Sequence, residues 1–94
     1  MTGPKSAIVW TSEDIISVIR ELARDAQFPA HLVDGKISER DSVDTLGIDS
    51  IGAVYLIDRL EVLTGVPMPD DFVAPGTDIS GIAARVNEIV GENS

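Results

Sequence analysis

The chain contains no cysteine and a single histidine, and aromatic residues make up only 4% of its 94 residues. Without cysteine it forms no disulfide, thiolate metal site or cysteine nucleophile, so any thiol chemistry must come from another molecule. The absence also fits a reducing compartment, and we expect a cytoplasmic protein. No apolar stretch approaches the roughly 20 residues that a membrane span needs, and residues 1–10 lack the apolar region of a signal peptide.

Positive charge is also scarce. Seven lysines and arginines stand against sixteen aspartates and glutamates, a net charge of −9. Nucleic acids and anionic membranes are polyanions, so we expect neither to be a partner. Residues 34–49 and residues 50–71 each carry a net charge of −3, from five acids and two bases and from four acids and one base. The charge therefore predicts partner proteins with basic docking patches.

Apolar residues recur with the period of an amphipathic helix in three stretches, residues 12–27, 50–64 and 78–90. Thr11 and Asp14 predict a capping box at the first start, and Thr77 or Asp78 is the expected cap of the third helix. In the second stretch Ser50 occupies a cap position, and the predicted buried stripe contains Ala53, Val54, Leu56, Ile57, Leu60 and Leu63.

No segment alternates like a half-buried strand, so the fold class is all-α: a small four-helix bundle of three long helices and one short one. The short helix is expected over residues 70–74. Residues 1–94 form one domain, with a core over about residues 11–91 and residues 1–10 as an N-terminal extension. Residues 28–49 form a long first loop without a convincing element, and such loops are usually functional or mobile.

The loop ends in Leu46-Gly47-Ile48-Asp49-Ser50-Ile51, which places a glycine turn, an acid and a serine before a helix. Taken alone, Ser50 is explained equally well as a helix cap and as a functional residue. Asp49 is favourable in either case, because its negative charge lies near the positive end of the helix dipole. The motif is followed by Leu60-Glu61, by Gly65 and by Pro69-Asp70.

This series of motifs resembles the acyl and peptidyl carrier proteins, strongly over residues 46–71 and in its helical layout over nearly the whole chain. The resemblance implies that a phosphopantetheinyl transferase moves 4′-phosphopantetheine from coenzyme A onto Ser50, and that the thiol of this arm carries cargo as a thioester. Asp49 matches the acid that helps the transferase to place its metal and coenzyme A. The protein would then catalyse nothing, and would present its cargo, as a monomer, to a loading ligase and to downstream synthase enzymes.

The resemblance also implies a partner-binding face on the same helix, made here by Ile51, Gly52, Tyr55, Asp58 and Arg59. Fatty-acid carriers often bear acids two and five residues after the serine and an apolar residue eight after it. This chain has Gly52, Tyr55 and Asp58 there, which favours a specialised biosynthetic pathway. Tyr55 is explained equally well as a packing residue.

Several alternatives remain open or are set aside. An aminoacyl or peptidyl carrier shares the attachment chemistry with an acyl carrier of a fatty-acid, polyketide or other pathway, and an acidic helical adaptor would use Ser50 only as a cap. A calcium-binding loop around Asp34 is set aside, because two positions that must supply side-chain oxygen ligands are occupied by the apolar residues Ala30 and Leu32. A hydrolase is set aside too, because Ile48 replaces the first glycine of the nucleophile elbow and His31 would be a remote base. We expect no metal site.

Overall fold

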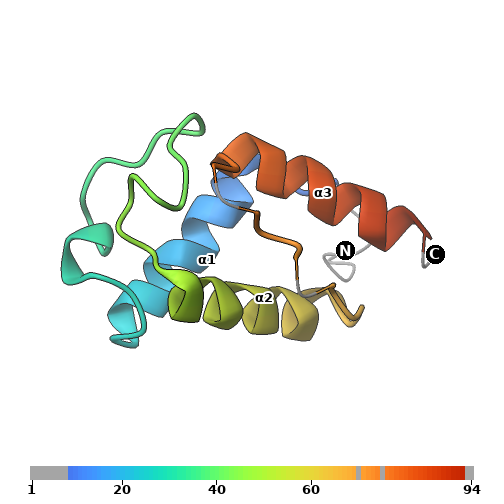
Figure 1. Ribbon diagram of the computed structural model, residues 1–94, viewed down its shortest axis with the longest axis horizontal. Coiled ribbons are helices and arrows are strands. Elements are labelled where there is room, and N and C mark those ends of the chain that lie inside the picture. Colours follow the sequence, from blue (N-terminus) through green and yellow to red (C-terminus); the bar gives the residue numbers. More distant parts are fainter. Residues whose placement is uncertain (1–8, 70, 75, 93–94) are drawn as a thin grey trace, which may run out of the picture.

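The computed structural model describes residues 9–69, 71–74 and 76–92. They form the α-helices α1 (Ser12–Arg24), α2 (Ser50–Thr64) and α3 (Ile79–Glu92) and the short 3-10 helix η2 (Ala30–Leu32). No β-strand occurs within these ranges, so the all-α prediction is confirmed. Helix α1 packs against α2, α3 and η2, and Figure 1 shows the long first loop gathered at one end of the molecule.

The core joins all three helices to the two long connections. Trp10 and Phe28 are buried in it, as are Met68 and Phe72 from the second connection. Asn87 fixes the backbone of Trp10. Its side chain accepts from the Trp10 backbone N–H at 2.8 Å and donates to the Trp10 carbonyl at 2.9 Å. The largest fully buried side chains are Ile15, Ile19, Leu32, Leu56, Leu60, Ile79, Ile82 and Val86.

Helix α1 begins as predicted but ends early. The Thr11–Asp14 capping box is present. The helix stops at Arg24 rather than residue 27, because Ala26 adopts a left-handed conformation with φ 64°. The Gln27 N–H then donates to the Leu22 carbonyl at 2.9 Å, which closes a Schellman turn. The turn directs Phe28 into the core, a contact that local periodicity does not encode.

Ala26→Gly is expected to raise the free energy of unfolding by about 1 kcal/mol, since a Cβ in the left-handed region costs about that much. Urea unfolding measures the change. Ala84→Gly is the matched control, at an exposed position inside α3. The control should lower stability by a similar amount. Loss of stability in both variants would contradict the strain assigned to Ala26.

Helix α3 is capped by Asp78, one of the two predicted caps, and extends to Glu92 rather than residue 90. The Asp78 carboxylate accepts from the Gly81 N–H at 2.7 Å and from the Ser80 hydroxyl at 2.9 Å. These bonds, that from Gly81 first, lower the pKa of Asp78. The cap therefore remains charged, and able to accept these bonds, to lower pH than an ordinary aspartate would.

The lack of periodicity in the long first loop had suggested that it has no regular structure. The structure shows instead that the loop is ordered by several contacts. It contains η2, and Arg20 of α1 donates to three of its carbonyls. At its other end the carbonyls of Glu39 and Asp41 accept from the N–H groups of Ser80 and Ile79, both at 3.0 Å. The loop thereby satisfies N–H groups that the first turn of α3 would otherwise leave without partners.

The short helix predicted over residues 70–74 is wrong for the described residues 71–74, which form a turn and bends; Asp70 lies outside the described residues. One bond, from the Phe72 N–H to the Pro69 carbonyl at 3.0 Å, closes a single turn. Pro67, Pro69 and Pro75 surround this segment, and proline lacks the N–H that a continuing helix needs. The short helical element lies instead in the first loop.

Candidate functional site

The segment before α2 alternates buried and exposed residues. Leu46 and Ile48 are buried, whereas Asp49 and Ser50 are exposed. Gly47, between Leu46 and Ile48, has a left-handed φ of 81°. The Ile48 N–H donates to the Val43 carbonyl at 2.9 Å. The two apolar side chains thus anchor the loop in the core and leave the acid and the serine at the surface.

Asp49, rather than Ser50, is the N-cap of α2. The Asp49 side chain accepts from the Gly52 N–H at 2.8 Å, and Ser50 is the first helical residue. The prediction that placed Ser50 at the cap is therefore wrong, because the carboxylate reaches the first-turn N–H that a serine cap would bind. Among the described residues, the Ser50 hydroxyl takes part in no hydrogen bond. The Ser50 side chain is exposed.

Gly52 faces the interior and not the exposed side of α2. A Cβ at this position would lie 2.8 Å from Ile48 Cγ2 and 3.2 Å from the Phe28 ring. Gly52 therefore does not lie on the exposed face predicted from the sequence. Its lack of a side chain lets the first turn of α2 approach the end of the loop closely, and an acid at this position has no room.

Gly52→Ala is expected to lower the free energy of unfolding by about 1 kcal/mol. Overpacking costs about 1–3 kcal/mol and outweighs the roughly 1 kcal/mol that alanine gains in a helix. The control is Gly91→Ala in α3, where an added Cβ meets nothing within 4 Å. That variant should be neutral or slightly more stable in the same thermal or urea unfolding measurement. Equal effects of the two substitutions would contradict the close packing at Gly52.

A cleft of about 380 Å³ opens beside Ser50. Its apolar lining comes from the end of the loop, from one side of α2 and from Val73 in the second connection. Asp44 and Asp49 add two carboxylates, and Asp44 also accepts from the Gly76 N–H at 3.2 Å. The residues that line the cleft are Val43, Asp44, Ile48, Asp49, Ser50, Ala53, Val54, Ile57 and Val73.

The outward face of α2 is unusually apolar. The prediction that Val54 and Leu63 belong to the buried stripe is wrong, because their side chains are 54% and 42% exposed. Thr64 is buried, and its hydroxyl donates to the Leu60 carbonyl at 2.8 Å. Because α2 is apolar on most of its circumference, periodicity alone did not show which face packs inward. The exposed large side chains of α2 are Ile51, Val54, Tyr55, Val62 and Leu63.

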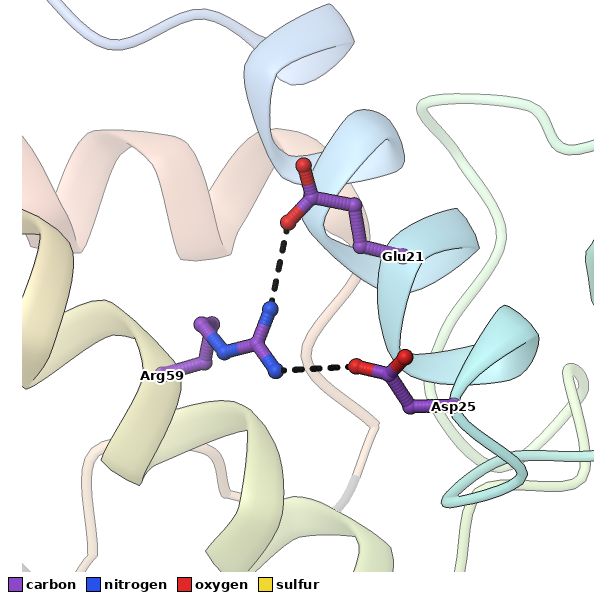
Figure 2. Close-up of polar contacts among 3 residues, drawn as sticks. All are labelled: Glu21, Asp25 and Arg59. Atoms are coloured by element: carbon purple, nitrogen blue, oxygen red, sulfur yellow. Dashed lines mark hydrogen bonds and ion pairs between the residues drawn. The ribbon is translucent and has the colours of Figure 1, made fainter.

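Two charged residues of α2 have partners elsewhere in the fold. Arg59 lies 3.1 Å from the carboxylate of Glu21 in α1 and 3.2 Å from that of Asp25, the residue that follows α1 (Figure 2). Glu61 accepts from the Met68 N–H at 2.7 Å and so fixes the turn after α2. Asp58 is exposed and has no ion pair or hydrogen bond within the described ranges.

The structure thus presents an unengaged serine hydroxyl at a helix N-terminus, next to an apolar cleft in an all-α domain. A family model described as a phosphopantetheine attachment site matches residues 17–86. The chain belongs to this family, and its prosthetic group is 4′-phosphopantetheine. Carrier domains of this kind are non-catalytic and work with a phosphopantetheinyl transferase and synthase partners.

Searches of curated proteins and of solved structures gave no significant match. Among the helices of the described residues, none combines the length and the hydrophobicity that a membrane span requires. The same part of the chain holds no cluster of three or more histidine or acidic side chains suited to a metal ion.

Proposed function

We propose that this protein is an acyl carrier whose arm is attached to Ser50 and whose cargo is a thioester intermediate of a fatty-acid, polyketide or other specialised pathway. The observation that carries the proposal is the exposed, unengaged Ser50 hydroxyl within the matched family region. In the attachment step the Ser50 oxygen attacks the β-phosphorus of coenzyme A. Adenosine 3′,5′-bisphosphate leaves, and the serine proton passes to the transferase or to solvent.

The residues around Ser50 suit the attached group. The first N–H groups of an α-helix such as α2 have no carbonyl acceptor within the helix. They can therefore donate to a phosphodiester, whose negative charge is favoured at a helix N-terminus. Asp49 holds the turn through Gly52 and leaves an exposed carboxylate for the transferase and its metal. When bound, the arm supplies the thiol that the chain itself lacks.

The apolar lining of the cleft favours an acyl cargo or the arm itself at this position, because burying apolar atoms there removes them from water. The second candidate function is an aminoacyl or peptidyl carrier. It is favoured by Asp44 and Asp49, whose carboxylates at the cleft suit an ammonium group. An adaptor with unmodified Ser50 has no specific observation in its favour.

Partner enzymes are proposed to approach along Ile51, Tyr55 and Asp58, which are exposed on α2. Such partners are a loading ligase and synthase enzymes with basic patches. Arg59, already held by two carboxylates, would act through the position of α2 rather than as a free cation. We further propose that the chain is a cytoplasmic, monomeric, non-catalytic carrier.

Intact-protein mass spectrometry after incubation with coenzyme A and a broad-range phosphopantetheinyl transferase tests the attachment. The expected result is a gain of one phosphopantetheine group, and an unchanged mass would overturn the proposal. Protein purified from its natural host then reveals the cargo, after release of the thioester with hydroxylamine. A fatty or polyketide acyl group supports the acyl carrier, whereas an amino acid or peptide supports the second candidate.

A further inference from the structure

The cleft beside Ser50 combines an apolar lining with an uncompensated negative charge. Six of its nine lining residues are apolar, two are aspartates and none is basic, so the lining carries a net charge of −2. Neither Asp44 nor Asp49 forms an ion pair with any of the described residues. A cargo that enters the cleft therefore meets both apolar surface and two carboxylates.

Backbone N–H groups hold both carboxylates at the cleft. Asp49 accepts from the Gly52 N–H at 2.8 Å, and Asp44 accepts from the Gly76 N–H at 3.2 Å. A backbone N–H carries no net charge, so these bonds position the two aspartates without neutralising them. The negative charge is thus a feature of the fold at this place.

The cleft extends along α2 from the attachment serine. Ser50, Ala53 and Ile57 all line it, and their spacing of i, i+3 and i+7 places them on one side of the helix. Ala53 is half-buried and Ile57 is buried. The small side chain of Ala53 leaves room next to Ser50, where the cargo end of a folded-back arm would lie.

Two kinds of acyl cargo would behave differently in this cleft. An uncharged apolar chain gains free energy when it leaves water for the apolar lining. A chain that ends in a carboxylate loses the hydration of that group and is also repelled by the two aspartates. Both aspartates are exposed, so water weakens this repulsion without removing it.

We propose that the charge of this cleft selects among cargos: acyl groups with an uncharged chain are sheltered beside Ser50, whereas acyl groups of dicarboxylic acids, which end in a carboxylate, stay in solvent. Asp44 determines this selection together with Asp49, which is also the helix cap. The inference rests on the proposed function, since cargo reaches the cleft only on an arm attached to Ser50. A dicarboxylic thioester on this carrier thus remains open to attack by nucleophiles, while an apolar one is protected.

A matched pair of cargos tests the selection. The phosphopantetheine-loaded protein is charged with a hexanoyl or an adipoyl group, which have equal numbers of carbon atoms and differ in the terminal carboxylate. Intact mass follows the cleavage of each thioester by hydroxylamine, and each rate is divided by that of the same thioester on free pantetheine. The hexanoyl thioester should react roughly tenfold more slowly than the adipoyl thioester, the scale of burying about two methylene groups. Equal normalised rates would overturn the proposal.

Asp44→Asn separates charge from shape. Asparagine keeps an oxygen that accepts from the Gly76 N–H but has no negative charge. The variant should slow cleavage of the adipoyl thioester by about threefold, the scale of one exposed charge pair, and leave the hexanoyl rate unchanged. Asp34→Asn, at an exposed acid outside the cleft, is the matched control and should change neither rate. An adipoyl rate that Asp44→Asn does not lower, or that Asp34→Asn lowers equally, would contradict the role of Asp44.

Two further measurements locate the sheltered cargo. Ala53→Leu fills the space next to Ser50, so the hexanoyl thioester of this variant should lose its protection. Amide hydrogen exchange at Val73, on the second connection, should be slower with hexanoyl than with adipoyl cargo. Protection that survives Ala53→Leu, or equal exchange at Val73, would place the cargo elsewhere and overturn the proposal. The mass gain from the transferase is measured first: its absence would refute the carrier function, whereas a full gain with equal protection of both cargos would refute only this inference.

Discussion

Ser50→Ala is expected to abolish phosphopantetheine attachment while changing the free energy of unfolding by less than about 0.5 kcal/mol. Attachment needs the hydroxyl oxygen, and no other atom of the variant replaces it. Stability is retained because the Ser50 hydroxyl has no hydrogen bond among the described residues and Asp49 supplies the helix cap. Intact mass after incubation with coenzyme A and the transferase measures the first effect, and urea unfolding measures the second.

Asp49→Ala is the complementary variant. It removes the acceptor that lies 2.8 Å from the Gly52 N–H, and loss of an N-cap costs about 1 kcal/mol. Ser17→Ala, at an exposed position on α1, is the control that should retain both attachment and stability. If Ser50→Ala lowered stability and Asp49→Ala did not, Ser50 would be the N-cap of α2 and its hydroxyl would be hydrogen-bonded. This result would contradict the assignment of Asp49 as the cap.

Arg20→Met is expected to lower the free energy of unfolding by about 2 kcal/mol, the scale of a hydrogen bond to a charged group. Arg20 Nη1 lies 3.2, 3.3 and 2.9 Å from the carbonyl oxygens of Leu32, Val33 and Gly35. Methionine keeps the apolar stem but leaves the three carbonyls without this donor. Urea unfolding measures the loss, and amide hydrogen exchange in residues 32–48 should become faster because the loop is held to α1 through this side chain.

Arg40→Met controls for the loss of a positive charge, because Arg40 is exposed and its side chain has no hydrogen bond or ion pair within the described residues. Its stability and its loop exchange should match those of the parent chain. Comparable losses in the two variants would show that net charge, rather than the three carbonyl contacts, governs the result. Arg20→Lys keeps the charge but changes the donor geometry. It should also lower the free energy of unfolding, because an ammonium group does not reproduce the reach of the guanidinium to the three carbonyls.

Local signals were sufficient for most helix boundaries. The Thr11–Asp14 box set the start of α1, and the predicted span of α2 agrees with the structure at both ends. Gly65 ends α2 with a left-handed φ of 72°, as a glycine after the last helical residue predicts. These features involve residues within one or two turns of each other, so the sequence contains their causes directly.

The motif around Ser50 and the excess of acids were also readable, and they led to the family that the family model independently matches. The sequence by itself therefore determined the all-α class, the location of α2 and the expected place of the prosthetic arm. It did not determine which of two adjacent polar residues caps α2, because both side chains have a suitable acceptor. The fold selected Asp49 and left Ser50 unengaged.

Only the tertiary structure decided which side of α2 faces solvent. The helix is apolar around most of its circumference, so its buried face depends on how it packs on α1 and on the loop. That packing turns Gly52 and Thr64 inward and Val54, Val62 and Leu63 outward. It also brings Arg59 to two carboxylates more than thirty residues away. Such contacts have no local sequence signal, because they depend on the relative positions of helices that meet only in the folded chain.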